Sequence, residues 1–264
     1  LVLVWQLLRI EPPGARTLAR LAMMAGAALA FITVAIPLQL EKQWITIGWG
    51  LEGAALVWLY RRIPHRGLLA WSGGLLAAVV VRLTLNPAIF EYHARSATPI
   101  VNWYLYSYLV CAIALFVTAA LLPRRERDDF PFAMPALTSA ATVLLFFLLN
   151  IEIADYYSSG AHLTFNFFSS SLAQDLTYTI LWALFAVAML VAGLVFRTRA
   201  ARVAALILLL VTILKCFLHD LARLGGLYRV GSLLGLALSL VIVGVLLQRF
   251  VLRAAEAVPA EEAS

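Results

Sequence analysis

Residues Val101–Leu122 read VNWYLYSYLVCAIALFVTAALL and carry no charged side chain. A helix needs about 20 consecutive apolar residues to cross the hydrocarbon core of a bilayer. Tryptophan and tyrosines crowd the start of this stretch, and Arg124, Arg125 and Arg127 follow its end. Aromatic rings and basic side chains are typical of the two interfaces of a membrane helix. The stretch therefore predicts a transmembrane helix.

The composition of the whole chain extends this prediction. Of 264 residues, 63% are apolar and 13% are charged, whereas soluble domains are roughly 45–50% apolar and 25% charged. The net charge is +6, but the basic residues lie in short clusters between apolar runs. That pattern is typical of membrane orientation signals, so membrane lipids are expected partners and nucleic acid is not. Cys111 and Cys216 lie in apolar segments without a second ligand at metal spacing, which favours small buried residues over a disulfide or a metal site.

Eight segments are long and apolar enough to be candidate spanning helices. They are Leu18–Leu40, Trp44–Tyr60, Gly67–Leu85, Val101–Leu122, Pro135–Ile153, Ala173–Phe196, Arg202–Leu218 and Val230–Gln248. The predicted fold class is therefore an all-α integral membrane protein of about eight transmembrane helices.

Five clusters of arginine lie before the first of these helices and after every second one. The clusters are Arg9, Arg16 and Arg20; Arg61, Arg62 and Arg66; Arg124, Arg125 and Arg127; Arg197, Arg199 and Arg202; and Arg249 with Arg253. Eight helices place all five clusters on one side of the membrane. The positive-inside rule makes that side cytoplasmic, so both termini are predicted to be cytoplasmic.

The chain resembles itself at one constant offset. Trp49 falls on Trp182, Arg66 on Arg199, and Arg82 on Lys215. The offset equals four helices, which predicts two parallel four-helix repeats of a kind found in transporters. Chance similarity between apolar sequences is the alternative.

These patterns predict the following organisation of the chain. Residues 1–16 form the tail of a preceding helix and a linker, 17–123 a first four-helix unit, and 124–134 a cytoplasmic linker. Residues 135–253 form a second four-helix unit. Residues 254–264 are small, acidic and predicted to be disordered.

Ionisable residues at membrane depth are the candidates for a functional site, because each costs about 3 kcal/mol at the centre of a helix. Glu52 lies in the middle of its segment, too deep for its short side chain to reach an interface. Arg82 and Lys215 lie in the outer third of theirs and could instead snorkel. Glu152 and Asp155 share one helix face at i,i+3. We hypothesise that Glu52, Arg82, Glu152 and Lys215 converge on one polar cavity open to the outer face, and structural ion pairs are the alternative.

Asp220 and Arg229 complete the set of polar-cavity candidates. Asp220 follows His219, but adjacent residues on a helix point about 100° apart, and the other histidines lie in other connections. An interfacial helix end is therefore favoured over a metal site. The chain has no Walker loop, dinucleotide fingerprint, His-Glu-x-x-His or Gly-x-Ser-x-Gly, so no catalytic residue and no cofactor is predicted.

The C-terminal third resembles a known family. Leu214–Leu221 (LKCFLHDL), then Leu227-Tyr228-Arg229-Val230 and Ser232, and the helix ending Gln248-Arg249-Phe250 are similar to the closing segment of a bacterial family of very large polytopic membrane proteins. Its members are known only as predicted membrane proteins with a domain of unknown function. Trp49–Leu56 (WGLEGAAL) followed by Arg61-Arg62 is similar to a unit that recurs in the family. The resemblance implies a bacterial inner membrane and an N-terminal remainder in a longer chain, which fits a first residue other than Met, and it supplies no catalytic residues.

Three functions compete at this point. A transport or translocation component with an outward-facing polar cavity is favoured by the parallel repeats and Glu52. A membrane-embedded enzyme of envelope biogenesis would use Glu52, Asp155 or Asp220 as acid or base. In a structural or assembly protein, the charges would be internal ion pairs only. The sequence leaves the substrate and the oligomeric state open.

Overall fold

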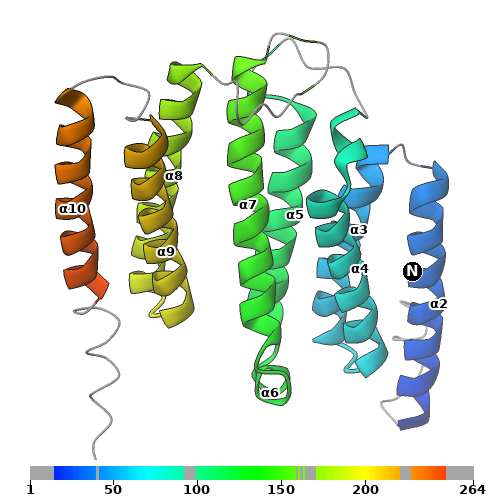
Figure 1. Ribbon diagram of the computed structural model, residues 1–264. Coiled ribbons are helices and arrows are strands. Elements are labelled where there is room, and N and C mark those ends of the chain that lie inside the picture. Colours follow the sequence, from blue (N-terminus) through cyan, green and yellow to red (C-terminus); the bar gives the residue numbers. More distant parts are fainter. Residues whose placement is uncertain are drawn as a thin grey trace, which may run out of the picture. The chain divides into compact units, whose positions relative to one another are not determined.

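A computed structural model describes residues 15–39, 42–91, 98, 100–158, 160, 163, 171–220 and 227–247. All the regular structure in these ranges is helical (Figure 1). The long helices are α2 (Ala15–Gln39), α3 (Lys42–Tyr60), α4 (Arg66–Leu85), α5 (Trp103–Leu121), α7 (Ala133–Tyr157), α8 (Leu172–Val195), α9 (Arg199–Lys215) and α10 (Leu227–Leu247). The short ones are the 3-10 helix η1 (Pro87–Glu91), the α-helix α6 (Arg124–Asp129) and the π-helix η2 (Cys216–Asp220).

Each long helix falls on one of the eight predicted segments, so the all-α prediction is confirmed. Five of them are long and apolar enough to cross a membrane. They are Arg66–Leu85, Trp103–Leu121, Ala133–Tyr157, Ala173–Val195 and Arg199–His219. The protein is therefore a multi-pass helical membrane protein, whereas eight spans are not confirmed. The predicted segments 1–16 and 254–264 reach outside the described residues.

The chain packs as two compact units, residues 1–164 and 165–264. The first unit contains α2 to α7 and the second contains α8 to α10. The long helix α7 packs along α5 in the first unit (Figure 1). The unit boundary thus follows α7, while the predicted repeat boundary precedes it, and the four-helix duplication remains a prediction.

Small residues bring α3 close to its neighbours in the first unit. A β-carbon added to Gly53 would lie 2.8 Å from Cγ of Leu76 on α4. The Ser72 hydroxyl donates a hydrogen bond of 2.7 Å to the Gly53 carbonyl. Lipid supplies no hydrophobic force between helices, so close packing and interhelical hydrogen bonds stabilise such contacts.

The two ends of α5 are held by side chains. At the N-terminus, Asn102 Oδ1 accepts a hydrogen bond of 2.9 Å from the Leu105 amide. At the C-terminus, Arg127 of α6 folds back and donates to the carbonyls of Ala119 (3.1 Å), Ala120 (3.2 Å) and Leu122 (2.9 Å). The last carbonyls of a helix have no partner within it, and the guanidinium group supplies one.

The second unit has a close α8–α9 turn and a π-helical end to α9. A β-carbon on Gly193 would lie 3.0 Å from the Arg202 backbone nitrogen. One on Gly235 of α10 would lie 2.8 Å from the Phe217 ring, so α10 packs closely against η2. Single π turns in helices occur frequently at functional sites.

Candidate functional site

The carboxyl group of Glu52 is buried among three helices of the first unit. The residue is 6% exposed and lies in the middle of α3. Its Oε1 is hydrogen-bonded to Thr33 Oγ1 on α2. Its Oε2 is buried and has no hydrogen-bond partner in the described part of the chain.

Thr33 connects Glu52 to two tryptophans. Its hydroxyl lies 3.0 Å from the Leu29 carbonyl, and Trp71 Nε1 on α4 donates to the same hydroxyl at 3.2 Å. Trp49 Nε1 lies 3.5 Å from the Thr33 carbonyl. A threonine hydroxyl has one proton to donate and two lone pairs to accept with. All three hydroxyl contacts are satisfied when Thr33 donates to Leu29 and accepts from Trp71 and from a protonated Glu52.

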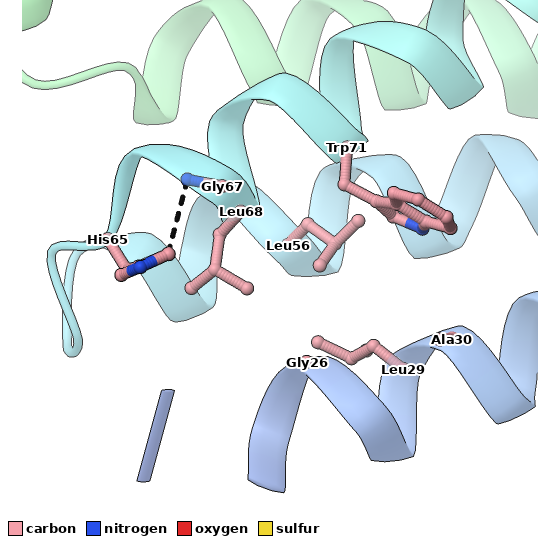
Figure 2. Close-up of a pocket in the computed structure, with 8 residues that line it drawn as sticks. All are labelled: Gly26, Leu29, Ala30, Leu56, His65, Gly67, Leu68 and Trp71. Carbon is pink, nitrogen blue, oxygen red and sulfur yellow. Dashed lines mark hydrogen bonds between the residues drawn. The ribbon is translucent and has the colours of Figure 1, made fainter. Parts of the chain in front are cut away.

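An apolar pocket of about 200 Å³ lies beside this network (Figure 2). It lies between α2, α3 and α4 and is lined by Gly26, Leu29, Ala30, Leu56, His65, Gly67, Leu68 and Trp71. Trp71 thus lines the pocket and donates to Thr33. At the pocket's edge, His65 Nδ1 accepts from the Gly67 amide at 3.2 Å, the dashed line in Figure 2.

A second polar cluster joins the start of α5 to the end of α7. The Asn102 amide donates to Glu152 Oε2 at 3.0 Å and to Asp155 Oδ2 at 3.3 Å. Asn102 is 3% and Asp155 1% exposed, and Glu152 Oε1 is buried without a hydrogen-bond partner in the described residues. The predicted shared face of Glu152 and Asp155 is confirmed, since one amide binds both.

The last turn of α4 adjoins the start of α5. Tyr108 is fully buried, and its hydroxyl donates to the Leu83 carbonyl at 2.7 Å. Arg82 is the neighbour of Leu83 and is partly buried. Arg82, a predicted cavity residue, therefore lies in the turn of α4 that is hydrogen-bonded to Tyr108 of α5.

A third cluster lies in the second unit, around Lys215. Its ammonium group donates to Thr179 Oγ1 at 2.8 Å and to the Asp175 carbonyl oxygen at 3.1 Å, both on α8. His219 Nε2, in η2, lies 3.7 Å from Asp175 Oδ2. The Asp175 side chain is buried, while that of His219 is partly exposed. Lys215 thus binds the backbone carbonyl of Asp175, while His219 lies near the buried carboxylate of the same residue.

The predicted polar-cavity residues whose side chains the structure describes lie in these clusters. Glu52 has Thr33 as its partner, Glu152 and Asp155 share Asn102, and Lys215 lies with Asp175. The side chains of Asp220 and Arg229 lie outside the described residues. Convergence on one cavity remains a prediction.

Sequence reasoning missed Thr33, Trp71, Asn102, Asp175 and Thr179. An asparagine just before an apolar run is a recognisable helix-capping signal, so Asn102 could have been found. Thr33 and Trp71 gave no such signal, because they become a site only through the packing of α2 on α3 and α4. Within the described residues, no group of three His, Cys, Asp or Glu side chains is placed to hold a metal ion.

Long apolar helices that bury carboxyl, amide and ammonium groups between them define a polytopic membrane protein with internal polar clusters. The family comparison makes this specific. Residues 1–162 and 60–250 each match the model of a family described as Predicted membrane protein (DUF2339). The chain belongs to this family, which confirms the resemblance drawn from its C-terminal third. No curated protein and no solved structure shows a significant match to the chain.

Proposed function

We propose that the chain is a transport or translocation component of the bacterial inner membrane, and that Glu52 is its proton-binding group. The Glu52 carboxyl carries this proposal: it is buried at mid-helix, one oxygen is bonded to Thr33, and the other has no partner in the described residues. Intramembrane acids are costly, and they mark proton relays and ion pathways in pumps and transporters. A structural ion pair would place a cation beside Glu52, whereas its hydrogen-bond partner within the described residues is the Thr33 hydroxyl.

The transported molecule is expected to be polar and to bind in a cavity open to the outer face. Glu152 supports this part of the proposal, since its buried Oε1 can accept a hydrogen bond that no described group supplies. A buried polar atom without a partner is uncommon in proteins and needs a cause such as water or ligand. Glu52 and Glu152 would then serve as proton site and substrate contact, respectively.

The enzyme alternative rests on His219 and Asp175. A buried carboxylate beside an imidazole can orient it as a general base, and Nε2 of His219 lies 3.7 Å from Asp175 Oδ2. Lys215, whose ammonium group donates to the Asp175 carbonyl, supplies a second polar group beside this pair. This alternative would be favoured if His219→Gln no longer formed a chemical product that wild type forms, while proton binding at Glu52 stayed unchanged.

The proton site can be tested by infrared spectroscopy of the full-length protein in lipid discs. Wild type at neutral pH is expected to show the C=O stretching band of a protonated, buried carboxyl group. The Thr33 hydroxyl contacts both this carboxyl and the Leu29 carbonyl and has a single proton to donate. Glu52→Gln should remove the band. Thr33→Val should keep it but move it to higher frequency, since the carboxyl loses its hydrogen-bond partner.

Transport is tested by the charge movement that proton binding causes. Proteoliposomes on a solid-supported electrode are subjected to a rapid pH step, and wild type is expected to give a transient current that Glu52→Gln abolishes. Glu126→Gln is the matched control, since Glu126 is another buried acid, hydrogen-bonded to Tyr60. Equal currents in wild type and Glu52→Gln would overturn the proposal.

A further inference from the structure

The end of α3 carries a hollow of about 330 Å³ lined by Trp58, Arg61 and Arg62. Its size is within the range of small-molecule sites, roughly 300–1,000 Å³. Trp58 is 54% exposed, and the Arg62 guanidinium lies 5.9 Å from the centre of its ring. The hollow thus combines two cations and one aromatic ring, and no carboxylate is found among the described residues that line it.

The turn after α3 fixes the positions from which both arginines project. The Arg61 amide donates to the Val57 carbonyl at 3.3 Å, and the Arg62 and Ile63 amides both donate to the Leu59 carbonyl at 2.9 Å. Ile63 is 6% exposed and anchors the turn in the core. The backbone positions of both arginines are therefore fixed, while their side chains remain exposed.

Several other charged side chains near this end of the first unit have partners within the described residues. Arg66 lies 3.8 Å from the Asp129 carboxylate, Arg127 binds the carbonyls at the end of α5, and Glu126 is bonded to Tyr60. Within the described ranges, neither Arg61 nor Arg62 has a carboxylate within ion-pair distance. A hollow lined by two arginines that have no carboxylate partner in the described residues attracts an anion.

We propose that this hollow binds the phosphate of an anionic phospholipid headgroup. Trp58 favours a lipid headgroup as the origin of the phosphate, because amphipathic rings concentrate at the headgroup level of a bilayer. From Trp58, α3 runs back into the apolar part of the unit. Guanidinium groups bind phosphate through paired hydrogen bonds. Arg61 supplies the free donor pair, and Arg62 is oriented by its contact with the Trp58 ring.

The test is lipid binding to the full-length protein, delipidated in detergent and titrated with phosphatidylglycerol, phosphatidylcholine or inorganic phosphate. Bound lipid is counted by native mass spectrometry. Wild type should retain phosphatidylglycerol over phosphatidylcholine, and the double variant Arg61→Gln/Arg62→Gln should bind it about tenfold to thirtyfold more weakly, given the contribution of each basic residue near a membrane surface. Arg61→Lys/Arg62→Lys should keep a larger share of the binding, because the charge remains.

Arg124→Gln/Arg125→Gln is the matched control, since it removes the same charge from another adjacent, exposed pair. An equal loss in this control would show a general charge effect and overturn the site. Equal affinity of wild type for the two lipids would also overturn it. If millimolar inorganic phosphate binds to the hollow and the protein shows no preference between the two lipid headgroups, the ligand is a free anion and the lipid proposal is wrong. The thermal unfolding midpoints of the lipid-free variants should equal that of wild type, which verifies that neither the Arg61/Arg62 nor the Arg124/Arg125 substitutions disturb the fold.

Discussion

Asn102→Ala will lower the free energy of unfolding of the first unit by roughly 3 kcal/mol or more. The change removes the helix cap of α5, worth about 1 kcal/mol. It also removes the donor for Glu152 and Asp155, and a buried charged group left without its hydrogen bond costs about 1–3 kcal/mol or more. Asn102 is 3% and Asp155 1% exposed, so the bond between them is shielded from bulk water. The measurement is the midpoint of thermal unfolding of the purified protein in lipid discs.

A second substitution separates the two roles of Asn102. Asn102→Asp keeps an oxygen that can cap the Leu105 amide, but it replaces the donor by a negative charge facing two carboxylates. We expect this variant to be at least as unstable as Asn102→Ala. Wild-type stability of Asn102→Asp would contradict the view that the amide holds the two acids.

Gly53→Leu will separate α3 from α4. A β-carbon at this position would lie 2.8 Å and 2.9 Å from Cγ and Cδ2 of Leu76, which is 2% exposed. Overpacking of a core costs typically about 1–3 kcal/mol, and the Ser72 hydrogen bond to the Gly53 carbonyl is lost in addition. The expected effect is a loss of roughly 3 kcal/mol in unfolding free energy, measured by thermal or denaturant unfolding.

Gly74→Leu is the control for Gly53→Leu. Gly74 lies on α4, and a β-carbon there meets no atom within 4 Å, so the same substitution should leave stability nearly unchanged. The double variant Gly53→Ala/Leu76→Ala should recover stability relative to Gly53→Ala alone. Equal damage in both glycine variants would contradict the α3–α4 contact as the cause, because leucine has a higher helix propensity than glycine at either position.

The positions of the helices could be predicted from the sequence because membrane length and hydropathy determine them locally. The fourth predicted segment, Val101–Leu122, becomes α5 at Trp103–Leu121. The partners of the helices could not be predicted in this way. The contact of α7 with α5 depends on side-chain shape along two apolar surfaces, which have nearly the same composition everywhere.

The candidate site was predicted less completely than the fold. Glu52 was recognisable because a mid-helix acid is unusual, and its burial is confirmed. Asp175 was overlooked because an acid in the first turn of a helix is ordinary there, where it interacts favourably with the helix dipole. Its importance arises only when α9 brings Lys215 and His219 to it. Pairwise partners of this kind are a property of the folded chain.

The threonines of the apolar helices have a consequence for how the chain enters the membrane. Hydroxyls such as those of Thr84, Thr118 and Thr212 donate to the carbonyl four residues earlier, so each helix carries its own acceptors during insertion. Asn102 differs, because Glu152 and Asp155 belong to a helix synthesised later. With insertion in order of synthesis, the amide of α5 stays at the interface, hydrated, until α7 arrives. Assembly of the α5–α7 pair is therefore the step of biogenesis at which a polar group passes from water to protein.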